Sequence, residues 1–153
     1  MVEVPAAVPI LDRLLNYADF VSIGTNDLTQ YMLAADRDAA ELVDDYSVLH
    51  PSVLRAIRQV VIASQEAGCD LSVCGEVAGE VGTACLLVGL GVRQLSMSPV
   101  RAARVRFGIR HAQASELADL AEQALQSESA SAVKALINEF QAGIRSLDAV
   151  SDS

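Results

Sequence analysis

Two kinds of segment alternate along this chain. Short apolar runs at residues 2–4, 20–23, 71–73 and 94–97 are each followed by a stretch in which apolar positions recur every three or four residues. Short apolar runs of this kind predict buried strands, and the longer spacing predicts helices. We expect helices at residues 10–18, 28–34, 51–67, 81–88, 99–109, 115–126 and 132–145.

The clearest predicted helix begins at Pro51 and ends at Gly68, which are residues typical of a helix start and a helix stop. Its apolar stripe predicts which side faces the core: Val53, Leu54, Ile57, Val60, Val61 and Ser64. Strand–helix alternation along the whole chain predicts an α/β fold with a parallel sheet and helices covering its faces. Four such units cannot close a (β/α)₈ barrel, which takes roughly 250 residues.

Composition narrows the classes of protein that this chain can represent. Its 153 residues make one domain or part of one, and with 52% apolar but only 4% aromatic residues the core must be aliphatic. A net charge of −9 argues against nucleic acid and anionic membranes as partners. The longest uncharged apolar stretch, residues 81–92, is too short for membrane insertion. Three cysteines without a secretory signal predict a reduced, cytoplasmic protein.

Polar side chains follow the second predicted strand directly. Gly24 ends the strand, and Thr25, Asn26 and Asp27 stand at its carboxyl end just before a predicted helix. A carboxylate there suits a hard divalent cation, and the backbone N–H groups of a helix start suit a phosphate. The same residues also fit an Asx turn in which Asn26 and Asp27 cap the helix. Local chemistry leaves both interpretations open.

Four motifs, taken together and in order, resemble those of the phosphoenolpyruvate-utilising enzymes. They are Gly-Thr-Asn-Asp-Leu-Thr-Gln at 24–30, Val-Glu-Val-Pro-Ala-Ala at 2–7, Val-Cys-Gly-Glu-Val-Ala-Gly at 73–79 and Leu-Ser-Met-Ser at 95–98. Within that family the chain is most similar to phosphoenolpyruvate–protein phosphotransferases: Enzyme I of the bacterial sugar phosphotransferase system, or its nitrogen-regulatory paralogue. The resemblance extends to about residue 140.

This resemblance implies a fold and a domain organisation. Residues 1–112 are expected to form the C-terminal half, about four βα units, of a phosphoenolpyruvate-binding TIM (β/α)₈ barrel. Residues 113–153 are expected to form a C-terminal helical segment that packs on it. A start directly on a strand supports the interpretation that the preceding half is missing. Such a half-barrel should expose two strand edges and an apolar face, so we expect a homo-oligomer.

The resemblance also implies a magnesium site. Glu3 and Asp27 match the two metal-binding carboxylates of the family, and Mg²⁺ typically takes one or two protein carboxylates. Asn26 and Arg37 would hold the phosphoryl group, and Gly24 and Thr25 would contact the substrate through their backbone. Without the family, Glu3 reads as an exposed terminal carboxylate, and Arg37 reads as one member of a surface ion pair.

Cys74 matches the proton donor of the family. A thiol with the ordinary cysteine pKa of about 8.5 is mostly protonated at neutral pH and could protonate an enolate to give pyruvate. Glu76 is expected to orient it. On its own, a cysteine that ends an apolar strand is commonly a small core residue. Cys69 and Cys85 lack the motif context, so we interpret both as packing residues.

The implied activity is phosphoryl transfer from phosphoenolpyruvate to a histidine on a separate N-terminal domain, and from there to a phosphocarrier protein. His50 and His111 do not resemble that histidine and are interpreted as structural residues at helix ends. Because the family draws further arginines from earlier strands, the chain alone is expected to be inactive. The alternatives are a non-catalytic dimerisation or regulatory fragment, and part of a pyruvate phosphate dikinase or phosphoenolpyruvate synthase.

Overall fold

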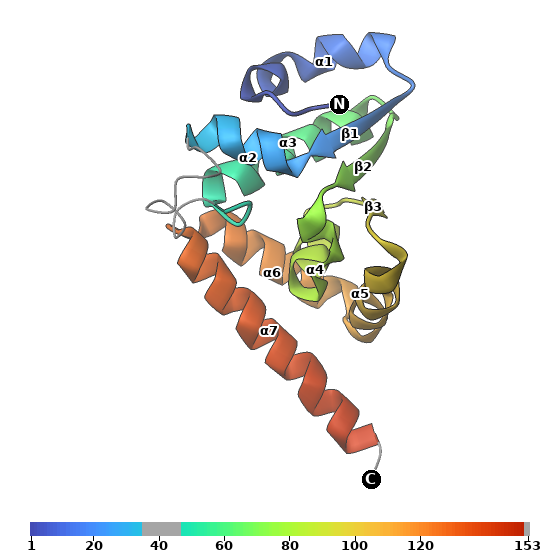
Figure 1. The fold of residues 1–153 in the computed structure, drawn as a ribbon, viewed down its shortest axis with the longest axis vertical. Coiled ribbons are helices and arrows are strands. Elements are labelled where there is room, and N and C mark those ends of the chain that lie inside the picture. The colour runs from blue at the N-terminus through green and yellow to red at the C-terminus, as the bar shows by residue number, and fades with distance from the viewer. Residues whose placement is uncertain (35–46, 152–153) are drawn as a thin grey trace.

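A three-stranded parallel sheet organises the molecule. The computed structural model describes residues 1–34 and 47–151, with side chains up to residue 143. Strands β1 (Phe20–Gly24), β2 (Asp70–Cys74) and β3 (Gln94–Ser96) lie side by side in chain order (Figure 1). All three coincide with predicted strands, which confirms an α/β fold built on a parallel sheet.

The prediction of a strand at residues 2–4 is wrong. Pairing there is reduced to one parallel bridge between Val2 and Ile23. The Val2 N–H donates to the Ser22 carbonyl at 2.7 Å, and the Gly24 N–H donates to the Val2 carbonyl at 3.0 Å. The extended backbone ends where the 3₁₀ helix η1 (Pro5–Ile10) begins. Pro5 cannot donate a ladder hydrogen bond, so pairing stops at this point.

The two faces of the sheet differ in chemistry. Val21, Ile23 and Val73 point to one face and are buried in the main core. Strand register places small polar side chains on the other face, none of them fully buried: Ser22, Ser72, Cys74, Gln94 and Ser96. Phe20, 70% exposed, shares that face. The prediction of an apolar exposed face is therefore wrong, because side chains alternate along each strand and only one face packs under helices.

Seven α-helices occur among the described residues, together with short 3₁₀ segments. The α-helices are α1 (Leu11–Leu14), α2 (Thr25–Leu33), α3 (Pro51–Glu66), α4 (Val81–Gly89), α5 (Pro99–His111), α6 (Ala114–Gln126) and α7 (Ala130–Ser151). The further 3₁₀ segments are η2 (Leu15–Tyr17) and η4 (Glu76–Gly79). The prediction of a continuous helix at residues 10–18 is wrong. In its place one short α-helical turn stands between η1 and η2, and η1 contains Pro9, which lacks an N–H.

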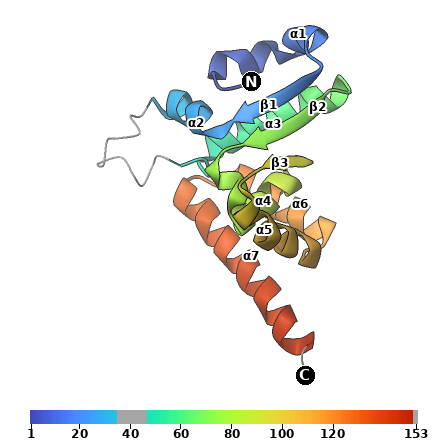
Figure 2. The ribbon, with the colours of Figure 1, turned by 45° about the vertical axis from the view of Figure 1, so that its right-hand side comes forward.

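Helix α3 matches its predicted start, end and inner face. All six side chains of the predicted inner face are buried. At its start the His50 ring nitrogen Nδ1 accepts the Ser52 backbone N–H at 3.2 Å, which confirms His50 as a helix-start residue. The chain leaves α3 through Gly68, whose φ of 64° is a left-handed conformation that favours glycine. Figure 2 shows α3 running behind β1 and β2.

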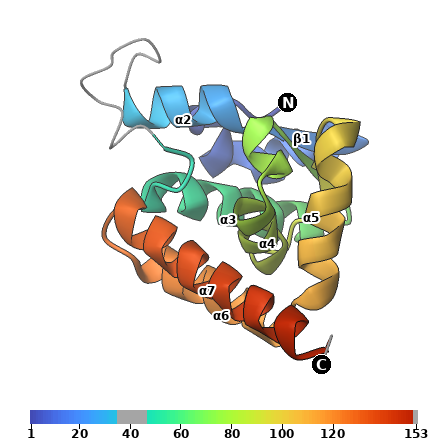
Figure 3. The same cartoon turned by 60° about the horizontal axis from the view of Figure 1, so that its bottom comes forward.

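The core is continued by the C-terminal helices. Leu120 and Ala124 of α6 and Val133 of α7 belong to the same buried cluster as the sheet. Gly89 at the end of α4 lies so close to α6 that a Cβ atom there would overlap the Leu117 carbonyl. Figure 3 shows α6 and α7 next to each other, below α4 in that view. No helix among the described residues is long and apolar enough to span a bilayer. The division of the chain at residue 112 stays a prediction.

Candidate active site at the strand ends

The carboxyl ends of β1 and β2 are joined by direct contacts. Gly24 pairs with Cys74 in the register of the two strands. One residue further along, the Thr25 hydroxyl donates to the Cys74 carbonyl at 3.1 Å. Gly75 has a φ of 136°, and a Cβ atom there would overlap the Thr25 hydroxyl. A glycine is therefore required at this corner by both its conformation and its close contact.

Glu3 reaches the same place from the N-terminal segment. Its side chain lies directly over Gly24, where an added Cβ atom would stand 2.6 Å from both Glu3 Cγ and Oε1. The bridge from Val2 to Ile23 fixes this position, because it aligns the N-terminal segment with the end of β1. Glu3 is half-buried, so the interpretation as a freely exposed terminal carboxylate does not hold.

Asp27 lies in the first turn of α2 and is exposed. The candidate metal ligands are therefore Glu3, which lies over Gly24, and Asp27, which stands three residues after Gly24 in the chain. Within the part of the chain that the structure describes, no three His, Cys, Asp or Glu side chains converge as a closed metal site. Magnesium does not need such a site, since it commonly keeps water and substrate oxygens in its remaining positions. The residues present therefore fit Mg²⁺.

A cavity of about 500 Å³ opens beside these corners. It brings Asn26 together with the two later motifs, and its lining is Asn26, Gly75, Glu76, Ser96, Met97, Ser98 and Arg101. Glu3, Asp27 and Cys74 are not among those lining residues. The structure thus gathers the sequence motifs at one edge of the sheet, but it divides the predicted site residues between this cavity and the rim around Gly24.

The Cys74 thiol lies on the polar face of the sheet. Its S–H donates to the Ile23 carbonyl, with the sulfur 3.3 Å from the oxygen, and the Ser22 hydroxyl donates to the sulfur at 3.4 Å. Glu76 is exposed, and no hydrogen bond is seen between its side chain and Cys74. Ser22 and Ile23, rather than Glu76, hold the thiol. Sequence reasoning missed Ser22, although a serine inside an apolar strand was a usable signal.

Arg101 is the second residue that the sequence did not indicate. It stands in the first turn of α5, and its guanidinium donates a long hydrogen bond of 3.5 Å to the Glu76 carbonyl. Its aliphatic stem lies against Gly79, where a Cβ atom would overlap it. Gly79, the last residue of the 73–79 motif, thus makes room for an arginine beside the cavity. Arg37 lies outside the described residues.

The other cysteines and His111 have structural surroundings. Cys85 is fully buried, and burial raises the pKa of its thiol to about 11. Cys69 is half-buried and packs against the edge of the core. His111 ends α5, where its ring stacks on Phe107 with centroids 3.9 Å apart. The surroundings of Cys69 and Cys85 are consistent with the prediction that both are packing residues.

Comparison with known proteins decides the family. A family model described as the PEP-binding domain of PEP-utilising enzymes matches residues 1–114. The chain belongs to this family. The resemblance carried by the four motifs is therefore confirmed. The matched range contains β1 to β3 and every candidate site residue named above.

Curated relatives of this PEP-binding domain are much longer proteins. A multiphosphoryl transfer protein of Xanthomonas campestris pv. campestris is 49% identical over 136 residues, which are 89% of this chain and 16% of the relative. A Salmonella typhimurium protein named phosphoenolpyruvate-dependent phosphotransferase system is 41% identical over 140 residues, 92% of this chain and 19% of the relative. A Haemophilus influenzae phosphoenolpyruvate-protein phosphotransferase is 42% identical over 140 residues, 92% of this chain and 24% of the relative. The chain spans less than a quarter of each.

Proposed function

We propose that this chain is the phosphoenolpyruvate-binding part of a cytoplasmic phosphoenolpyruvate–protein phosphotransferase. The observation that carries the proposal is the meeting of Glu3, Gly24–Asn26 and Cys74–Gly75 at the ends of two adjacent parallel strands. Parallel strands of α/β enzymes carry their chemistry at this edge. The names of the relatives add that such domains occur in PEP-dependent phosphotransferases.

In this proposal the substrate lies at the start of α2. The first backbone N–H groups of that helix have no partner within the helix, so they can bind a phosphate together with the Asn26 amide. Gly24 and Thr25 contribute backbone contacts, and the absent Cβ of Gly24 lets the Glu3 side chain lie against this strand end. Arg37 supplies a guanidinium that can bind two phosphate oxygens at once.

Glu3 and Asp27 hold Mg²⁺ in this proposal. A bound magnesium would neutralise phosphate charge as the phosphoryl group leaves. The part that the protein performs is to keep both carboxylates at the rim of the site. Glu3 is held by the Val2 bridge, and Asp27 is held by the first turn of α2. Asn26 stands between the rim and the cavity.

Cys74 protonates the enolate. When the bond between phosphorus and the enol oxygen breaks, the phosphoryl group passes to a histidine on a separate N-terminal domain, and later to a phosphocarrier protein. The enolate carbon then takes the proton from Cys74 Sγ, which gives pyruvate and leaves a thiolate that regains a proton from water. Ser22 and the Ile23 carbonyl fix the sulfur through their hydrogen bonds.

The finer architecture is part of the same proposal. Residues 1–112 are the C-terminal half of a TIM (β/α)₈ barrel, and residues 113–153 are a helical segment on its outside. The parallel order β1-β2-β3 and the helix between each pair of strands support this arrangement. Because the two outer strand edges have no ladder partners among the described residues beyond the Val2 bridge, the isolated chain should form a homo-oligomer. A compact, well-folded monomer in sedimentation velocity would contradict that expectation.

A chimera tests the function. We would replace the matching 140 residues of the Haemophilus influenzae phosphotransferase with this chain and measure pyruvate release from phosphoenolpyruvate in magnesium. The chimera should release pyruvate and pass phosphate to the phosphocarrier, whereas the 153-residue chain alone should do neither. A chimera that folds and dimerises like its parent but forms no pyruvate would support the non-catalytic alternative.

A further inference from the structure

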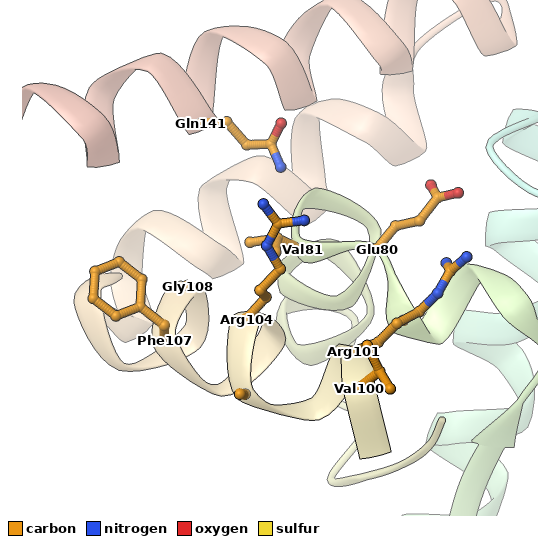
Figure 4. Close-up of a pocket in the computed structure, with 10 residues that line it drawn as sticks. Glu80, Val81, Val100, Arg101, Arg104, Phe107, Gly108 and Gln141 are labelled. Atoms are coloured by element: carbon orange, nitrogen blue, oxygen red, sulfur yellow. The ribbon is translucent and has the colours of Figure 1, made fainter. Parts of the chain in front are cut away.

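A second cavity, of about 880 Å³, adjoins the cavity at the strand ends, and the two share Arg101 as a lining residue. The second cavity is an open groove whose lining residues come from α5, from the turn that leads into α4, and from α7. Figure 4 shows Arg104 rising from α5 toward Gln141 of α7, with Phe107 on one side and Arg101 on the other. Val81 lines the same space, packed so closely on α5 that a Cβ atom at Gly108 would overlap it. The cavity thus combines cationic and apolar walls.

Helix α5 is strongly basic in an acidic protein. It carries four arginines and no acidic residue, while the whole chain has a net charge of −9. Within the described side chains, none of these four arginines forms an ion pair. They divide between two sides of the helix: Arg101 and Arg104 line the second cavity, whereas Arg106 and Arg110 line a different hollow beside β3.

We propose that this second cavity is a binding site for a small organic anion, with its carboxylate or phosphate between Arg101 and Arg104 and its apolar body against Val81 and Phe107. Guanidinium groups three residues apart on a helix share one face, so both can reach a single oxyanion. Gln141 adds a neutral amide from α7. A cavity of this size matches those that hold small molecules, which are mostly apolar with a few placed polar groups.

Glu80 lowers the positive charge of the second cavity. It lines the same cavity, and its Oε2 accepts the Thr83 hydroxyl at 3.4 Å. Together with Arg101 and Arg104 it leaves the lining with a net charge of about +1 at neutral pH. Removing the Glu80 charge should therefore strengthen anion binding, and removing the Arg104 charge should weaken it.

Phenyl phosphate, benzoate and inorganic phosphate are suitable probes for calorimetry on the full chain. One of the two aromatic anions should bind saturably and at least about tenfold more tightly than inorganic phosphate, because its ring contacts the apolar wall. Tighter binding of phenyl phosphate assigns a phosphate ligand, and tighter binding of benzoate assigns a carboxylate. No saturable binding of either aromatic anion up to about 10 mM would overturn the proposal.

Matched variants locate the binding. Arg104→Ala should weaken the preferred probe about tenfold, and Glu80→Gln should strengthen it. Arg106→Ala removes the same charge from the other side of the same helix and should leave the affinity unchanged. Equal losses in Arg104→Ala and Arg106→Ala would mean general attraction to a basic helix and would refute the site. Asn26→Ala, in the proposed substrate site, should have no effect, so the two proposals can fail separately.

Discussion

The two faces of the sheet are built from neighbouring residues of the same strands, yet they differ in almost every property. Ile23 is completely buried under the helices, while Ser22 beside it is half-buried on the open face and contacts a thiol. Val73 and Cys74 repeat this difference in β2. One face supplies stability through apolar burial, and the other holds small polar groups that leave room for a ligand.

The side chains that the proposed function uses are therefore ones whose removal should cost little stability. The open face holds no large core residue, so changes there can alter chemistry without unfolding the protein. The covered face has the opposite character, since a shortened side chain leaves a cavity among helices. Substitutions at adjacent positions therefore separate the two roles.

The largest effect is expected on the covered face. Ile23→Ala should lower the free energy of unfolding by about 2–5 kcal/mol, because a fully buried side chain is replaced by a cavity. Urea denaturation of the chain measures this, with Ser22→Ala as the matched control one residue away. If Ser22→Ala destabilised the protein as much as Ile23→Ala, the distinction between the faces would fail.

On the open face, Cys74→Ala should lower pyruvate formation by the chimera about 100-fold or more, which is the usual range for loss of a general acid. The free energy of unfolding should change by only ~1 kcal/mol, and phosphoenolpyruvate binding should persist, since protonation follows binding. Cys69→Ala and Cys85→Ala are the controls, because both are packing residues. Turnover of the Cys74 variant equal to that of these controls would refute the proton-donor role.

Asp27→Ala tests the proposed magnesium site near the end of β1. It should weaken phosphoenolpyruvate binding by the chimera about tenfold in magnesium, because the proposed magnesium site would lose one of its two carboxylates. Without magnesium, wild type and variant should bind equally weakly. A loss of the same size in the presence of a chelator would show that Asp27 acts by capping α2 and not by holding metal.

The smallest effect concerns Cys85 in the helical core. The unfolded thiol has the ordinary cysteine pKa of about 8.5, while burial raises the pKa of the folded thiol to about 11. Between these values the unfolded state is the one that ionises, so stability should fall as pH rises, with a slope on the order of 1 kcal/mol per pH unit. Urea denaturation from pH 8 to 11 should show a shallower fall for Cys85→Ala. Parallel curves would contradict burial of this thiol.

Most of the local structure and the family can be predicted from the amino-acid sequence. Three strands and the inner face of α3 follow from apolar periodicity, and the caps of α3 follow from His50, Pro51 and Gly68, because these are short-range effects. The four motifs were sufficient to identify the PEP-binding domain.

Features that depend on contacts between distant segments follow only from the three-dimensional arrangement. Strand register places Ser22 and Cys74 on one face, and the Val2 bridge brings Glu3 over Gly24. The close contact at Gly79 sets Arg101 beside the cavity, and the packing of α7 on α4 and α6 adds Gln141 to the lining of the second one. Hydrophobic periodicity records which side of an element is buried, but not which element covers it, because that choice is made by packing across the whole chain.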